Sequence, residues 1–346
     1  MGCRIVGCGK ALPRRAVTND ELSTIVDTDD EWIRTRTGIR TRHVAVGESA
    51  TDLAASAGAR ALSHAGIGAD EIDLIVCMTI TPDAVIPSQA CLVKARLGLS
   101  RAVAFDLNAA CTGCIYGIEV ASSMLEASAA DAARASRRAG RTTRNRMRRA
   151  LVVGVDVLSR IVDWSDRATC VLFGDGAGAV VLEWDDDAPG VMASVLENTD
   201  DEDLLLSCGN LHAASGSPFS SPGGEKPKPV DPYIRMQGQR VFKFASASMA
   251  SAIEEVVARA GVVLDDVSLI VAHQANERII RYAAKKIGRP IDLFQVSIAE
   301  VGNTSASSVL MALCDAWLAG RVALGDKVVL VGFGGGLCAG AVLFEA

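Results

Sequence analysis

The feature of this sequence that most constrains its fold is an order of apolar runs that occurs twice. Three landmarks recur in the same order, namely residues 73–77 with 268–272, residues 105–107 with 294–296, and residues 150–154 with 328–332. Short apolar runs that alternate with segments of helical spacing are typical of α/β proteins. We therefore predict an internal duplication of an α/β unit, with the two halves meeting near residue 185.

The same landmarks locate an insertion. Phe105 and Leu151 are 46 positions apart, whereas Phe294 and Val329 are 35 apart, so the first half carries about 11 extra residues. The surplus falls where residues 131–149 hold eight arginines and one aspartate, a local charge of +7 that leaves −13 for the rest of a chain with net charge −6. We interpret residues 127–149 as an insertion that extends the preceding helix or loops from its end. A solvated surface segment is its simplest role.

The composition is that of an ordinary globular protein, since 346 residues with 49% hydrophobic and 22% charged side chains can bury a large core. We expect no membrane span and no signal peptide. Ten cysteines without secretory context favour reduced thiols and a cytoplasmic location, and the net negative charge argues against nucleic acid. Residues 215–232, rich in proline and glycine, are predicted to form a loop, and helical spacing resumes over 240–259.

Cys111 lies where a strand-like run gives way to helical spacing. Ile115, Ile118 and Ala121 recur as one buried helix face would. Unpaired N–H groups at a helix N-terminus stabilise an anion, so a thiol there is expected to ionise below its free pKa of about 8.5 and to act as a nucleophile. The small residues of 109–113 leave room for a substrate. A buried structural cysteine is the alternative.

Cys111 and Cys114 also form a C-x-x-C pair. A zinc site needs two more ligands at motif spacing, and elsewhere only Cys3 and Cys8 lie near each other. A thioredoxin-like redox site usually comes in a far shorter domain. No metal is therefore expected, and a redox or metal role is the weaker interpretation.

Polar residues follow apolar runs in the second half. His273 comes directly after residues 269–272, at the end of a predicted strand where α/β sheets bind ligands, although a histidine satisfied within the core is the alternative. Asn303 heads the helix that corresponds to the Cys111 helix, where an N-cap is its simpler role. The duplication would bring both helix N-termini together beside His273. The glycines of 334–336 precede a strand, which excludes a Rossmann site and suits an oxyanion hole.

Taken together, these motifs make the sequence resemble β-ketoacyl-acyl-carrier-protein synthase III, a condensing enzyme of the thiolase-like superfamily. The resemblance covers nearly the whole chain outside the arginine-rich insertion. It is carried by residues 30–33 (DEWI), 35–39 (TRTGI), 110–111 (AC), 173–178 (FGDGAG), 273–276 (HQAN), 302–305 (GNTS) and 334–336 (GGG). It implies a thiolase-like α/β fold in which two duplicated βαβαβαββ halves, residues 1–185 and 186–346, form five αβαβα layers.

The resemblance also implies roles for individual residues. The implied triad is Cys111, His273 and Asn303, and the implied oxyanion hole is formed by the N–H groups of Cys111 and Gly335. The residues implied to bind coenzyme A are Trp32, Arg36, Arg167, Gly238, Phe242 and Asn276. The residues implied to dock the acyl carrier protein (ACP) are Lys243, Arg278, Lys285 and Lys286. The residues implied at the acyl pocket are Phe333 and Ile86, the latter reaching into the pocket of the partner subunit.

The implied reaction needs no cofactor. An acyl group passes from acyl-CoA to Cys111 and is then condensed with malonyl-ACP, with loss of CO2, in a cytoplasmic homodimer that initiates fatty acid synthesis. Three departures from the family pattern leave the acyl primer open, namely Gln239, Leu337 with Cys338, and Ile86.

Three other functions are alternatives to the implied one. A related acyltransferase or condensing enzyme of secondary metabolism with the same triad is the main alternative. A noncatalytic acyl-CoA-binding homologue is a minor one, because the triad is intact. A thiolase proper is disfavoured, because Cys338 follows the glycine turn instead of preceding it.

Overall fold

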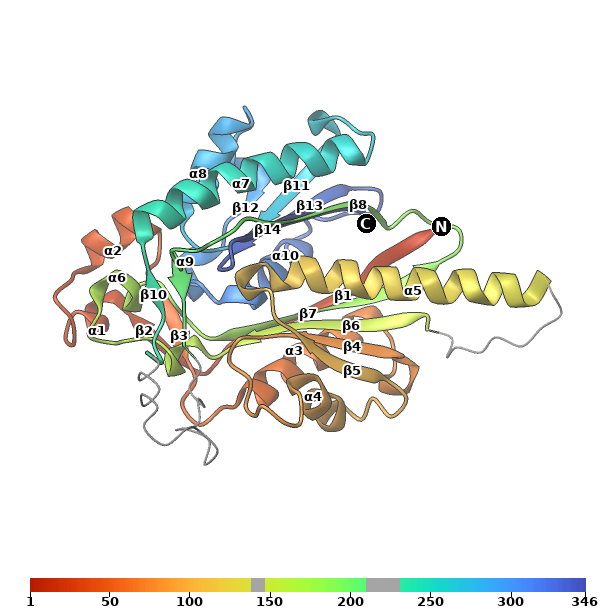
Figure 1. The fold of residues 1–346 in the computed structure, drawn as a ribbon, viewed down its shortest axis with the longest axis horizontal. Helices are drawn as coiled ribbons and strands as arrows, with labels where there is room; N and C mark the ends of the chain where they lie inside the picture. Colours follow the sequence, from red (N-terminus) through yellow and green to blue (C-terminus); the bar gives the residue numbers. More distant parts are fainter. Residues whose placement is uncertain (138–146, 210–230) are drawn as a thin grey trace, which may run out of the picture.

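The computed structural model of the protein describes residues 1–137, 147–209 and 231–346. Within these residues the chain forms two five-stranded sheets that lie one above the other, with helices on both faces of each sheet (Figure 1). Two further pairs of short strands stand apart from these sheets.

The first sheet has the strand order β1-β7-β6-β4-β5. Strand β4 runs parallel to β5 and β6, whereas β7 runs antiparallel to β1 and β6. The bounds are β1 Gly2–Ala11, β4 Leu74–Met78, β5 Val103–Leu107, β6 Arg149–Asp156 and β7 Gly176–Asp185.

The second sheet repeats this arrangement in the order β8-β14-β13-β11-β12. Strand β11 is parallel to β12 and β13, and β14 is antiparallel to β13 and β8. The bounds are β8 Val191–Asn198, β11 Val267–Ala272, β12 Phe294–Gln295, β13 Lys327–Gly334 and β14 Cys338–Glu345. The predicted duplication is therefore confirmed strand by strand. A boundary near residue 185, where the first sheet ends, stays a prediction.

The long helices complete five αβαβα layers, as predicted (Figure 1). Helices α3 and α4 cover the outer face of the first sheet, α7 and α8 cover that of the second, and α5 and α10 lie between the sheets. One cluster of buried apolar side chains joins the central helices to both sheets, and two others lie between the outer helices and the second and first sheets, respectively. The bounds are α3 Ala50–Ala65, α4 Gln89–Leu97, α5 Gly113–Arg137, α7 Gly238–Arg259, α8 Glu277–Lys286 and α10 Ser308–Leu318.

Shorter elements connect the layers. They are strands β2 Arg15–Thr18, β3 Thr41–Val44, β9 Leu206–Ser207 and β10 Arg235–Met236; helices α1 Asn19–Leu22, α2 Asp30–Thr37, α6 Arg167–Cys170 and α9 Ile298–Val301; and 3-10 turns η1 Ala69–Glu71, η2 Ala110–Thr112, η3 Leu158–Arg160, η4 Leu264–Asp266, η5 Ile291–Leu293 and η6 Ser305–Ser307.

Helix α5 shows what the arginine-rich insertion does as far as the chain is described. Helix α5 has 25 residues and its counterpart α10 has 11, so the insertion extends the helix as far as Arg137. The rest of the insertion up to residue 146, and the predicted loop 215–232 as far as residue 230, lie outside the described residues. The predicted helix over 240–259 is confirmed by α7.

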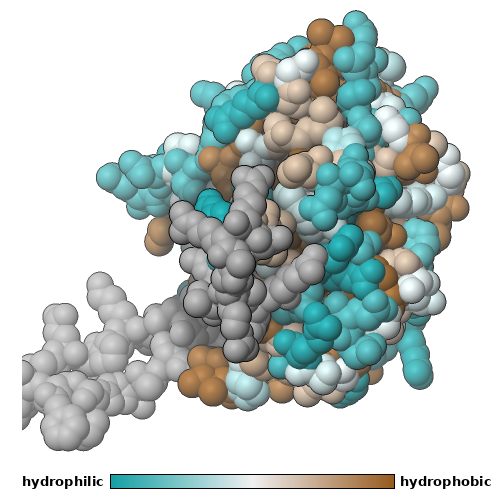
Figure 2. All heavy atoms as spheres, turned by 90° about the vertical axis from the view of Figure 1, so that its right-hand side faces the viewer, coloured by the Kyte–Doolittle hydropathy of each residue, from teal (hydrophilic) through white to brown (hydrophobic). Residues whose placement is uncertain are grey.

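Two features are absent from the part of the chain that the structure describes. None of its helices combines the length and apolar character that crossing a membrane requires. It also holds no cluster of three or more histidine, cysteine, aspartate or glutamate side chains suited to a metal ion. On the face seen in Figure 2, hydrophilic and hydrophobic side chains are intermixed wherever described residues are in view, as on an ordinary protein surface.

Candidate active site

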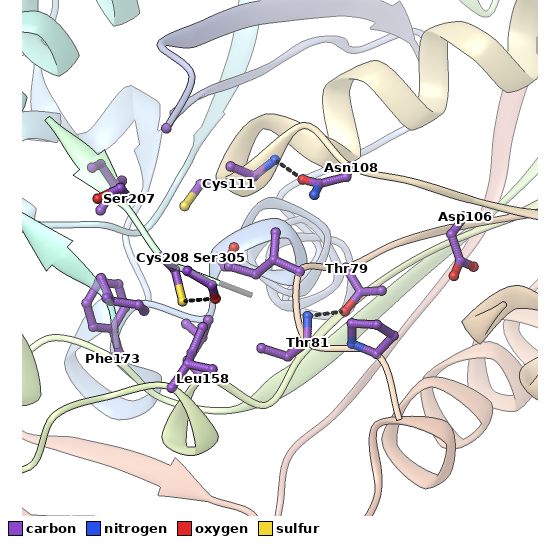
Figure 3. A pocket seen from close by; sticks show the side chains of 18 of the residues that line it. Thr79, Thr81, Asp106, Asn108, Cys111, Leu158, Phe173, Ser207, Cys208 and Ser305 are labelled. Carbon is purple, nitrogen blue, oxygen red and sulfur yellow. Dashed lines mark hydrogen bonds between the residues drawn. The ribbon is translucent and has the colours of Figure 1, made fainter. Parts of the chain in front are cut away.

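Cys111 lies between β5 and α5, at the strand-to-helix junction that the sequence predicts. It sits in the turn η2, just after Ala110, whose φ of 46° is unusual for a residue with a side chain. The carboxamide Oδ1 of Asn108 accepts a hydrogen bond of 3.2 Å from the Ala110 backbone N–H and holds this turn (Figure 3). Only 7% of Cys111 is exposed.

Burial decides the ionisation of this thiol. It raises the pKa of Cys111 to about 11, while the nearby Ser305 hydroxyl and the Cys111 backbone N–H act in the opposite direction and offset only part of the rise. The expectation of a thiol that ionises below its free pKa is therefore wrong for the unliganded protein. The thiol is the resting form, so its proton must leave as the sulfur attacks.

Asn303 occupies the position in the second half that Asn108 occupies in the first. It precedes turn η6 and helix α10, and its Oδ1 accepts a hydrogen bond of 2.9 Å from the Ser305 backbone N–H. Ser305 has a φ of 53°, close to that of Ala110. Turns η2 and η6 pack against each other, so the expected approach of the two helix N-termini is confirmed.

His273 follows strand β11 and is only 1% exposed. Its backbone N–H donates to Val331 O at 2.8 Å, and its Nδ1 lies 2.5 Å from Ser308 Oγ. The ring of Phe333 stands edge-on to the imidazole, with 5.1 Å between the ring centroids. Burial lowers the pKa of His273 to about 3, so the imidazole is neutral at physiological pH.

Two cavities meet at Cys111. The smaller, of about 80 Å³, is lined by Cys111, His273 and Asn303 together, and also by Gly238, Phe242, Asn276 and Phe333. The larger, of about 560 Å³, is lined by Cys111, Gly335 and Ser305, by the apolar side chains of Ile80, Val85, Leu158, Ile161, Phe173, Leu206 and Ile234, and by the polar side chains of Thr79, Thr81, Asp106, Asn108 and Ser207. Figure 3 shows these polar side chains in the cavity together with Cys111, Leu158 and Phe173. A thiol, an imidazole and a carboxamide thus face the smaller space, and a larger cavity with both apolar and polar walls faces the same sulfur.

The other residues implied to bind coenzyme A gather at one surface. The guanidinium carbons of Arg36 and Arg167 lie 4.6 and 5.0 Å from the ring centroid of Trp32. Asn276 caps helix α8 through Oδ1 and donates from Nδ2 to Arg36 O at 3.0 Å, which ties this surface to the smaller cavity. A continuous row of implied residues therefore leads from Trp32 toward Cys111.

The four basic residues implied to dock the ACP are exposed on α7 and α8, which pack together. Arg278 lies 5.7 Å from the centroid of the Phe242 ring, at the mouth of the smaller cavity. Lys243, Lys285 and Lys286 project from the same two helices.

The two residues implied at the acyl pocket lie apart. Phe333 lines the smaller cavity against His273 and is not part of the wall of the larger one. Ile86 is 88% exposed and lines neither cavity of this chain, although its neighbour Val85 lines the larger one.

Sequence reasoning missed Ser305, Ser308 and Cys208. Ser305 and Cys208 line the larger cavity, and Ser308 contacts His273. The run of three serines within 305–308, directly after Asn303, was the available signal for the first two. Nothing in the sequence marks Cys208.

Comparison with known proteins agrees with this geometry. The family model described as "3-Oxoacyl-[acyl-carrier-protein (ACP)] synthase III C terminal" matches residues 257–346, and "3-Oxoacyl-[acyl-carrier-protein (ACP)] synthase III" matches residues 139–200. The β-ketoacyl-[acyl-carrier-protein] synthase III of Clostridium beijerinckii is 41% identical over 342 residues, which is 99% of this chain and 98% of the relative. The chain belongs to the β-ketoacyl-ACP synthase III family.

Other relatives and solved structures support the assignment to the synthase III family. The synthase III of Rhodospirillum centenum is 42% identical over 98% of this chain and 97% of its own. The crystal structure of the synthase III from Aquifex aeolicus covers 100% of both chains at 39% identity, with a TM-score of 0.87. The fold is thus the thiolase-like fold of synthase III structures. The priming β-ketosynthase of the R1128 polyketide pathway is also similar, at 33% identity, 99% and 96% coverage and a TM-score of 0.84.

Proposed function

We propose that this chain is a β-ketoacyl-ACP synthase III that loads an acyl group from acyl-CoA on Cys111 and condenses it with malonyl-ACP. The observation that carries the proposal is the smaller cavity, which is lined by a thiol, an imidazole and a carboxamide from three separate segments. A buried thiol alone would be ordinary, but these three groups suit thioester exchange and decarboxylation in one place.

In the first step, the sulfur of Cys111 attacks the thioester carbonyl of acyl-CoA. The bond from carbon to the CoA sulfur breaks, and the proton of Cys111 ends on the released CoA thiol, so no redox partner is needed. The N–H groups of Cys111 and Gly335 form the proposed oxyanion hole, which is supported by the position of both residues in the wall of the larger cavity.

In the second step, malonyl-ACP enters and loses CO2. Neutral His273 and Asn303 donate hydrogen bonds to the malonyl thioester oxygen and stabilise the enolate that forms. The enolate carbon attacks the acyl-Cys111 carbonyl, the bond to sulfur breaks, and 3-ketoacyl-ACP leaves. The Cys111 thiolate then takes up one proton from water, which restores the thiol. The neutral state of His273 supports this role, because a neutral donor needs no compensating charge in a buried site.

Trp32, Arg36 and Arg167 are proposed to hold the adenine and phosphates of coenzyme A. Two guanidinium groups beside one indole ring suit a planar base and an anion. Gly238, Phe242 and Asn276 would line the passage for the pantetheine arm. We propose that the ACP docks on the basic side chains of Lys243, Arg278, Lys285 and Lys286. Such a surface is complementary in charge to an acidic carrier protein.

A homodimer is proposed because the isolated chain leaves two features unpartnered. Strand β5 is the last strand of its sheet and pairs only with β4 among the described residues. Such an open edge is suited to pairing with a second copy. Ile86 is 88% exposed next to the wall of the larger cavity, and it would reach the acyl pocket of the partner. The ten unpaired cysteines support a cytoplasmic location.

Intact-protein mass spectrometry tests the proposal. Wild type and Cys111→Ser are incubated with acetyl-, isobutyryl-, butyryl- and octanoyl-CoA, and malonyl-ACP is then added. The expected result is one acyl adduct on wild type alone, followed by its loss and the appearance of 3-ketoacyl-ACP. Loading without condensation would favour a related acyltransferase that uses another acceptor. No loading by any primer would overturn the proposal.

A further inference from the structure

The side chain of Ser308 has a contact that no step of the proposed reaction accounts for. Ser308 is the first residue of α10 and is buried, and its Oγ lies 2.5 Å from Nδ1 of His273. The backbone N–H of Gln274 also points at the same oxygen, at 3.4 Å. The adjacent Ser307 is equally buried but donates its hydroxyl to Thr304 O at 2.9 Å, as serines near a helix start commonly do.

We propose that Ser308 is a positioning residue that holds His273 in the tautomer with its proton on Nε2. This inference rests on the proposed function, because it concerns how the imidazole becomes a donor to the malonyl thioester.

The hydrogen atoms of the three groups can be assigned by elimination. A serine hydroxyl has one hydrogen to donate and two lone pairs. The N–H of Gln274 takes one lone pair. Among the hydrogen bonds of residues 1–137, 147–209 and 231–346, Nδ1 of His273 is the one acceptor within reach of the Ser308 hydroxyl. The hydroxyl therefore donates to Nδ1.

The opposite tautomer leaves a buried donor without an acceptor. If Nδ1 carried the proton, it would donate to Ser308 Oγ, and the Ser308 hydrogen would have no partner at a buried site. An unsatisfied buried donor costs about 1–3 kcal/mol, which would make this tautomer a minor form. Phe333 restrains the imidazole from its edge but carries no polar atom, so it cannot choose between the tautomers.

The consequence lies in the smaller cavity. Since Nδ1 is occupied by Ser308, Nε2 is the ring nitrogen of His273 left for a ligand, and in this tautomer it is a donor. Asn303 is arranged in the same way, because Ser305 N–H occupies its Oδ1 and leaves Nδ2 as the donor. Both side chains thus use their acceptor atom inside the protein and offer a donor to the thioester oxygen.

The test compares Ser308→Ala with Ser307→Ala, a matched loss of one hydroxyl from the neighbouring buried position that does not contact His273. The protein is labelled with 15N-histidine, and its four histidines give few ring signals. The signals of His273 are those absent from His273→Asn. In wild type and Ser307→Ala, the chemical shifts should show an unprotonated Nδ1 and a protonated Nε2. In Ser308→Ala, they should move toward the average of the two tautomers.

Activity provides the second readout. Acyl loading of Cys111 should stay within twofold of wild type in both variants. Decarboxylation of malonyl-ACP should fall about 10- to 100-fold in Ser308→Ala, by analogy with metal-bound histidines that lose the hydrogen-bond partner of their second ring nitrogen. Ser308→Thr, which keeps the hydroxyl, should recover most of the rate.

Three results would overturn the inference: a protonated Nδ1 in wild type, unchanged His273 shifts in Ser308→Ala, or equal losses of rate in the two alanine variants. The wild-type spectrum alone decides the tautomer if Ser308→Ala does not fold. Failure of wild type to load any acyl-CoA would refute the proposed function, and the tautomer would still be read from the spectrum.

Discussion

Replacement of Gly334 should disturb the backbone at Cys111 while leaving the three side chains of the proposed triad unchanged. It ends strand β13, and a Cβ built on it would lie 2.8 Å from the backbone nitrogen of Cys111. That is about 0.6 Å short of the 3.4 Å at which ordinary contacts begin. Because the obstructed atom is backbone, Gly334→Ala must displace turn η2 rather than a flexible side chain. Overpacking of this kind costs about 1–3 kcal/mol of stability.

The displacement should also slow acyl loading of Cys111. The Cys111 N–H is also half of the proposed oxyanion hole, and a shift approaching 1 Å at a reacting group can cost about 100-fold. We expect acyl loading of Gly334→Ala to be about 10- to 100-fold slower than wild type, or about 1.4–2.7 kcal/mol of barrier. The rate is measured by a mass-spectrometric time course with acyl-CoA, and stability by urea unfolding.

Gly332 supplies the control. It lies two residues earlier on the same face of β13, toward Thr112 and Ile115, but a Cβ there would have its nearest neighbours at 3.5 Å. Gly332→Ala should therefore load at nearly the wild-type rate. Wild-type loading by Gly334→Ala, or an equal defect in both variants, would refute the argument that contact with the Cys111 backbone requires a glycine.

Three further predictions follow from the site. Alkylation of the Cys111 peptide should still rise about tenfold per pH unit between pH 8 and 10, because burial raises the thiol pKa to about 11 and only the thiolate reacts; a plateau below pH 8 would contradict this. His273→Ala and Asn303→Ala should still load acyl groups, but each should raise the free-energy barrier to malonyl decarboxylation by about 3–4 kcal/mol. A normal rate of decarboxylation in either variant would show that the replaced side chain takes no part in this step. Ile86→Phe should lower kcat/KM for octanoyl- and butyryl-CoA while sparing acetyl-CoA, whereas equal effects on all primers would mean that residue 86 does not face the acyl chain.

Periodicity predicted most of the fold because the landmarks of the central strands β4, β6, β11 and β13 are largely buried. Buried parallel strands are continuous apolar runs, and a duplicated chain repeats them in order, so both sheets could be predicted without knowledge of any contact. The junction at Cys111 was predicted for the same reason. The continuation of helix α5 through Arg137 was left open between a helical extension and a loop, because the alanine- and arginine-rich residues of 127–137 suit both a helix and a solvated surface segment.

The electrostatic properties of the site could not be predicted in this way. The pKa of Cys111 depends on how completely η6 and β13 cover the sulfur, and those segments are about 200 positions away in the sequence. The same holds for Ser308, because a serine at a helix start is usually a cap, and only the tertiary fold brings its hydroxyl to His273. The family resemblance implied that Trp32, Arg36 and Arg167 bind coenzyme A, but neither it nor the spacing of these residues indicated that both guanidinium groups contact the indole ring.

The duplication also explains why a chain with two equivalent halves has one site. Strand β6 ends in Asp156 where β13 ends in Gly334, and turn η6 has Ala306 where η2 has Cys111. The side chain of Asp156 occupies the space beside turn η6, where its carboxyl oxygens accept hydrogen bonds from Thr79 Oγ1 at 3.1 Å and from Ala306 N at 3.4 Å.

At the equivalent place in the other half, Gly334 has no side chain, and the Cys111 backbone approaches it directly. His273 then stands where the first half has Thr79, directly after β11 rather than β4. In the proposed reaction one half thus contributes the thiol of Cys111 and the other contributes the two proposed donors, whereas the carboxyl group of Asp156 occupies the corresponding place beside Ala306. A thiol introduced by Ala306→Cys would therefore stand next to a carboxyl group that already accepts a hydrogen bond from its N–H, so that N–H would not be available for an oxyanion hole like the one proposed at Cys111.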